Sequence, residues 1–91
     1  MVIEKIGKPA MLEQLAEEAA ELSQAALKLA RVLRGENPTP VTQEEAEKHL
    51  IEEYTDVWLC AYELGLPVDL KQIDEKLERF QKRWEGKEQC R

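Results

Sequence analysis

The chain has 91 residues, a length that fits one small domain. It carries 13 Lys and Arg against 19 Asp and Glu, which gives a formal net charge of −6, and 43% of its residues are hydrophobic. This composition is too apolar for a disordered chain, and no apolar run approaches the roughly 18 residues of a membrane span. The acidic balance argues against a general nucleic-acid binder, which would present a basic face.

The start of the chain and its cysteines bear on location. Residues 1–8 carry no clear pattern and lack the apolar stretch of a signal peptide. Two cysteines, Cys60 and Cys90, are too few for a disulfide scaffold, so a reducing compartment is the simpler reading. We therefore expect one cytoplasmic domain over residues 1–91, with loose ends at 1–8 and 87–91.

Residues 9–34 are predicted to form one long helix, because no Gly or Pro interrupts them after Pro9. Their apolar residues recur at alternating spacings of three and four: Leu12, Leu15, Ala19, Leu22, Ala26, Leu29 and Leu33. Gly35 is well placed to end this helix. The segment 35–40 is predicted to be a loop, because its two prolines forbid regular helix.

Two further helices are predicted from their start signals. Thr42 and Glu45 fit a capping box, and the second helix follows until Gly65; its apolar stripe is Leu50, Tyr54, Val57, Ala61 and Leu64. Asp69 opens the third helix by the same logic, and Gly86 is expected to end it; its stripe is Leu70, Ile73, Leu77, Phe80 and Trp84. No segment alternates at period two, so the prediction is all-α, with three main helices in an antiparallel bundle.

The acidic residues fall into two groups. In the third helix, Glu75 and Glu78 have Arg79 and Lys82 four residues later, an ordinary stabilising arrangement. Glu18, Glu21, Glu53 and Asp56 of the first two helices have no Lys or Arg three or four positions away; Glu13 and Glu17 share this property, so it is the placement of the four acids that matters. The usual helix rules therefore do not explain these four.

The placement of the four acids suggests a metal site. With Leu15 and Leu50 as the centres of their stripes, each helix carries its two acids about 60° and 120° to the same side. Antiparallel packing would bring all four carboxylates to one edge of the interface, where they repel unless a cation neutralises them. Carboxylate oxygens suit Mg²⁺ or Mn²⁺. The alternative is a solvated acidic flank without a ligand.

The same acids carry a resemblance to a known family. Glu17, Glu18 and Glu21 on one helix, followed by Glu53 and Asp56 on the next, resemble the signature of the MazG-like all-α nucleoside triphosphate pyrophosphohydrolases, in particular the short phage- or prophage-type members. The resemblance implies hydrolysis of a nucleoside triphosphate to the monophosphate and pyrophosphate. It also implies that the last four of these acids bind Mg²⁺, with Mn²⁺ as a substitute, while Glu17 either orients or deprotonates the attacking water or is a surface residue.

The resemblance covers roughly residues 9–84 and includes the third helix. There, Lys76, Arg79 and Arg83 resemble the family's basic positions that approach phosphates. In the family, these basic residues can belong to a neighbouring subunit. Lys28 is a further phosphate-binding candidate, because it lies seven residues after Glu21 on the same flank.

Two predictions remain at the level of the whole molecule. We expect the helices to complete four-helix-bundle packing by self-association, as a homodimer or homotetramer that acts in nucleotide-pool house-cleaning. The rival is a non-catalytic helical oligomerisation or interaction module, or a regulator, which would show the same apolar stripes and charges without binding metal.

Overall fold

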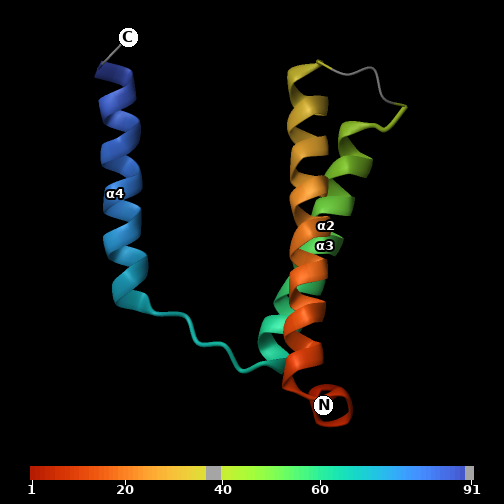
Figure 1. Cartoon of the computed structure of the whole chain (residues 1–91). Coiled ribbons are helices and arrows are strands. Elements are labelled where there is room, and N and C mark those ends of the chain that lie inside the picture. The colour runs from red at the N-terminus through yellow and green to blue at the C-terminus, as the bar shows by residue number, and fades with distance from the viewer. Residues whose placement is uncertain (37–39, 90–91) are drawn as a thin grey trace.

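The computed structural model describes residues 1–36 and 40–89, and side chains as far as residue 86. Four helices follow one another: α1 (Ile3–Ile6), α2 (Lys8–Arg34), α3 (Gln43–Glu63) and α4 (Leu70–Gln89) (Figure 1). The described residues form no strand, which confirms the all-α prediction. Within the same residues, no helix is both long and apolar enough to cross a membrane.

The ends of the long helices follow their local signals. Gly35 ends α2 in the left-handed region, with φ of 66°, a conformation that glycine adopts without strain. The Glu45 N–H donates to Oγ1 of Thr42 at 3.1 Å at the start of α3. The Gln72 N–H donates to a carboxylate oxygen of Asp69 at 3.0 Å at the start of α4. These caps confirm the predicted helix starts.

The N-terminal segment, expected to be loose over residues 1–8, forms the helical turn α1 and bonds to the end of α3. The Val2 N–H donates to a carboxylate oxygen of Glu63. Gly7 then joins α1 to α2 with φ of 88°, again a conformation that favours glycine. Because Val2 and Glu63 are 61 residues apart, no local pattern predicts this contact.

At the other end of the chain, α4 continues through Gly86 to Gln89, so the prediction that Gly86 ends this helix is wrong. A glycine inside a helix costs only about 1 kcal/mol relative to alanine, and no proline follows to stop the helix. The segment 87–91, predicted to be loose, is helical as far as Gln89. Cys90 and Arg91 lie outside the described residues.

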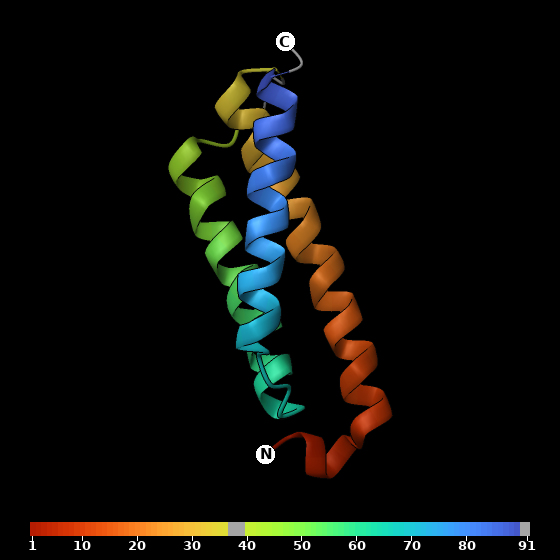
Figure 2. The same cartoon turned by 90° about the vertical axis from the view of Figure 1, so that its left-hand side faces the viewer.

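α2 and α3 run antiparallel and side by side, and they form the main contact of the fold (Figures 1 and 2). The buried residues of the described chain are few: Met11, Ala25, Ala46 and Cys60. Leu15 and Leu50, the predicted stripe centres, are half-buried, whereas Leu12, Leu33 and Tyr54 of the predicted stripes are 44%, 60% and 60% exposed. The contact face is therefore rotated from the predicted stripes toward the acids.

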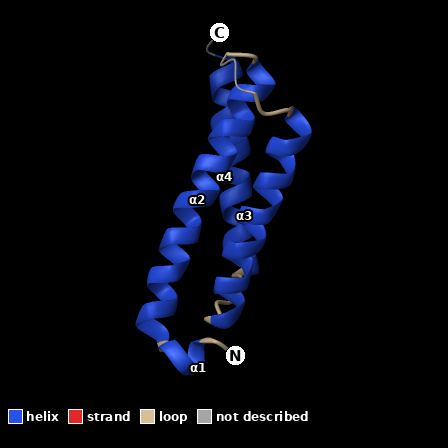
Figure 3. Ribbon diagram, turned by 90° about the vertical axis from the view of Figure 1, so that its right-hand side faces the viewer, coloured by secondary structure: helices blue, strands red, loops and turns tan. Residues whose placement is uncertain are grey.

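α4 lies apart from this pair and is exposed along its described length. The non-helical segment 66–69 carries the chain away from the end of α3 before α4 begins (Figure 1). The three long helices run lengthwise, and α1 lies across the end near the N-terminus (Figure 3). One chain thus presents a two-helix layer and a separate amphipathic helix.

Candidate metal centre

Three acidic side chains meet between α2 and α3. Glu18 comes from α2, and Glu53 and Asp56 come from α3; one carboxylate oxygen of each lies within 4.8 Å of the others. Glu18 and Glu53 are half-buried, and Asp56 is exposed. Glu21, the fourth predicted ligand, is exposed and is not part of this group. The structure therefore brings three of the four predicted ligands together.

Two of these acids occupy a layer of the helix interface. Successive layers lie seven residues apart in an antiparallel register: Met11 faces Cys60, Glu18 faces Glu53, and this register places Ala25 opposite Ala46. The four residues of the outer two layers are only 1–7% exposed. Buried apolar residues lie on either side of the two half-buried carboxylates of the middle layer.

Each acid of the middle layer has one oxygen bonded and one oxygen without a partner. Nε2 of Gln14 donates to Oε1 of Glu18 at 2.8 Å, and Nε2 of His49 lies 3.1 Å from Oε1 of Glu53. The Oε2 atoms of both acids are buried and have no hydrogen-bond partner. Buried polar atoms are nearly always satisfied, so these two oxygens mark a candidate cation site, whereas the equally unpartnered Oε2 of Glu63 lies outside the group.

Of the four basic residues predicted to contact phosphate, one lies near the two acids of the middle layer and three lie away from them. Lys28 is half-buried and lines a groove of about 380 Å³ together with His49, the residue that contacts Glu53. The other three are exposed on α4, which does not approach the carboxylates of its own chain: Lys76, Arg79 and Arg83. Glu17, the candidate for the attacking water, is exposed on α2 beside Glu18.

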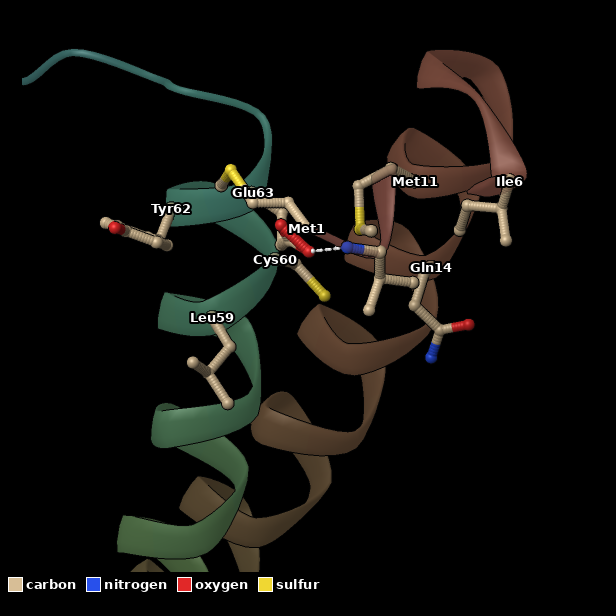
Figure 4. Close-up of a pocket in the computed structure, with 9 residues that line it drawn as sticks. Met1, Ile6, Met11, Gln14, Leu59, Cys60, Tyr62 and Glu63 are labelled. Atoms are coloured by element: carbon tan, nitrogen blue, oxygen red, sulfur yellow. Dashed lines mark hydrogen bonds between the residues drawn. The ribbon is translucent and has the colours of Figure 1, made fainter. Parts of the chain in front are cut away.

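An apolar pocket of about 520 Å³ adjoins the carboxylates at the end near the N-terminus (Figure 4). Met11 and Cys60 line it from α2 and α3, and Met1 closes part of it. Gln14 lines the pocket and also bonds to Glu18, so the two features share a side chain. The sequence analysis did not identify Gln14, although its position four residues before Glu18 is a local signal. No local signal indicates that Met1, Val2 and Ile6 line this pocket.

The buried thiol of Cys60 reports the negative charge of the site. Burial raises its pKa above the usual 9.0, and the carboxylates of Glu18, Asp56 and Glu63 raise it further. A thiol that is kept protonated is a poor nucleophile.

Stability is expected to fall at high pH because of Cys60. With a raised pKa in the folded state, the protonated thiol contributes stability that is complete below pH 9.0 and is lost as the pH rises through the raised value. Urea unfolding measured at several pH values should show a steeper loss above pH 9.0 for the native chain than for Cys60→Ala. Parallel curves for the two proteins would contradict the raised pKa.

No family model matches the chain, and no curated protein and no solved structure matches it.

Proposed function

We propose that this chain is a Mg²⁺-dependent nucleoside triphosphate pyrophosphohydrolase, which converts a nucleoside triphosphate to the monophosphate and pyrophosphate. The observation that carries this proposal is the meeting of three carboxylates within 4.8 Å, two of them with buried oxygens that lack partners. An all-carboxylate donor set suits Mg²⁺, with Mn²⁺ as a substitute. The order of the acids along the two helices, which resembles the MazG-like signature, supports the choice of reaction.

Each acid has a role in the proposal. Glu18, Glu53 and Asp56 hold Mg²⁺ in the proposal. Glu21, one turn after Glu18, lies exposed outside this group and would have to turn toward the ion to act as a fourth ligand. When bound there, Mg²⁺ offsets the charge of the triphosphate and lowers the pKa of a bound water. Glu17 is exposed beside Glu18, where its carboxylate can accept a proton from the attacking water.

Basic side chains provide the phosphate contacts. Lys28 is the candidate within the same chain, because it shares a groove with His49 next to Glu53. Lys76, Arg79 and Arg83 are exposed on α4 and stand away from the carboxylates of their own chain. These three bases therefore lie outside the site of their own chain, and Lys28 is the phosphate contact of the proposal.

A non-catalytic interaction module is the second candidate function. The observation that favours it is the apolar face of α4, whose large side chains are about half exposed. Such a module needs no metal, so the paired acids in the middle layer of the α2–α3 interface count against it. Both functions fit a cytoplasmic protein with the free thiol of Cys60.

The test is incubation with a panel of ribo- and deoxyribonucleoside triphosphates, with Mg²⁺, with Mn²⁺ and with a chelator. We expect divalent-dependent release of pyrophosphate together with the monophosphate, resolved by ³¹P NMR. Release of orthophosphate would contradict the assigned bond cleavage. No turnover on any substrate, together with no heat of Mg²⁺ binding in calorimetry, would favour the interaction module.

A further inference from the structure

The first observation is the apolar face of α4. Five large side chains recur along it at spacings of three and four, and all are substantially exposed: Leu70 (75%), Ile73 (45%), Leu77 (52%), Phe80 (53%) and Trp84 (48%). Phe80 and Trp84 pack edge to face, with ring centroids 6.1 Å apart, but both rings remain open to solvent. A helix with such a face is stabilised in water chiefly by packing that face against another element.

The second observation is an exposed apolar face on α3, distinct from the face that packs on α2. Four residues at spacings of three and four form it: Ile51 (64% exposed), Tyr54 (60%), Trp58 (53%) and Tyr62 (60%). The Trp58 and Tyr62 rings stack with centroids 5.4 Å apart. Trp58 lies about 80° from Leu50, on the side opposite to Glu53. This face and the carboxylates are therefore on different flanks of α3.

The third observation is the surface of the whole chain. It exposes 7580 Å², whereas a compact monomer of 10.5 kDa exposes about 5400 Å². Its radius of gyration is 17.1 Å, against about 12 Å for a compact domain of this length. Two copies that bury this excess would cover on the order of 4000 Å², an area within the range of obligate homodimers.

We propose that a second copy of this chain covers both faces: α4 of each copy packs its apolar face on the exposed apolar face of α3 of the other. The segment 66–69 already holds α4 away from its own α3, which leaves both faces open to a partner (Figure 1). The contact is reciprocal and closes as a symmetric dimer. The apolar surface supports this dimer without reference to metal or substrate.

Charge favours α4 as the occupant of this face of α3. α3 carries seven acids and one Lys, which gives 1 − 7 = −6, and α4 carries six bases and five acids, which gives 6 − 5 = +1. Two α3 helices placed face to face would bring −6 against −6, which is unfavourable. Packing α4 on α3 avoids that repulsion.

The first measurement is the mass of the native chain by sedimentation at micromolar concentration, where we expect a dimer. Leu77→Asp on α4 and Trp58→Asp on α3 should each weaken dimerisation by at least about 100-fold, because each places a charge at the centre of both contacts. Lys82→Gln and Lys48→Gln are matched controls, since they make the same change of net charge at exposed sites away from the two faces. Far-UV circular dichroism verifies that all four variants keep their helices.

Mixing the two variants separates exchange between copies from closure within one chain. A heterodimer of Leu77→Asp and Trp58→Asp chains holds one contact in which both surfaces are native, so the mixture should dimerise although each variant alone is monomeric. A mixture that stays monomeric would overturn the proposal, as would a compact native monomer with α4 folded onto its own α3. A dimer that resists Leu77→Asp but not Trp58→Asp would assign the face to α3 pairing instead, which also overturns it.

Discussion

Glu53→Gln is expected to abolish Mg²⁺-dependent turnover and yet stabilise the metal-free protein. Glu53 and Glu18 each have one buried oxygen without a partner, one carboxylate oxygen of each lies within 4.8 Å of the other, and the two charges repel each other when no cation is bound. Removing one charge relieves this repulsion, which should raise the melting temperature of the metal-free protein. The amide of Gln keeps the shape and the contact with His49.

Mg²⁺ should reverse this order of stability. A cation that binds only the folded state at about 100 times its dissociation constant stabilises the native chain by about 2.7 kcal/mol. The Glu53→Gln variant loses a ligand and should gain much less, with turnover lower by at least about 100-fold. Urea unfolding with chelator and with saturating Mg²⁺ measures both effects on the same two proteins.

Glu52→Gln is the matched control for this experiment. Glu52 is the preceding residue of α3, and its side chain is exposed, so the same chemical change there leaves the site intact. We expect native turnover and a native response to Mg²⁺. If Glu53→Gln behaves like Glu52→Gln in both measurements, Glu53 is not a metal ligand, and the proposed site is wrong.

The sequence was a sufficient guide to the helices, because their boundaries depend on local chemistry. Gly35, Thr42 and Asp69 end or begin helices where predicted, through a left-handed turn and two side-chain caps. Gly86 misled the prediction, because one glycine without a following proline is too weak a signal to stop α4. α1 escaped notice because its contact to Glu63 is between distant parts of the chain.

The face by which each helix packs on its neighbour was predicted less well than the length of the helix. Periodicity gives the centre of all the apolar residues on a helix, and α3 has two apolar faces: one packs on α2, and the other contains Tyr54 and Trp58 and is exposed. The average of the two falls near Leu50, away from the true contact. The actual contact is rotated toward Glu53, so Glu18 and Glu53 lie inside the interface, whereas Glu21 and Asp56 stay exposed at its edge.

Ala25→Leu is expected to lower the stability of the metal-free protein, whereas Glu53→Gln should raise it. Both variants should lose turnover. Ala25 is 2% exposed in the layer next to the two acids, and the antiparallel register places the equally small Ala46 across from it. A leucine in this close contact should cost about 1–3 kcal/mol by overpacking, a large share of the stability of a small domain. By spreading α2 from α3, it should also separate Glu18 from Glu53.

Ala20→Leu is the control, because Ala20 is exposed on the same helix and the same substitution there adds no buried volume. Native-like stability of Ala25→Leu would mean that α2 and α3 do not approach through their alanines. Together the two site variants separate charge from packing: Glu53→Gln should lose turnover while the metal-free protein becomes more stable, and Ala25→Leu should lose turnover while it becomes less stable. If helix packing assembles the site and the charges of its acids oppose it, one variant should gain stability and the other should lose it. A solvated acidic surface predicts neither change in stability.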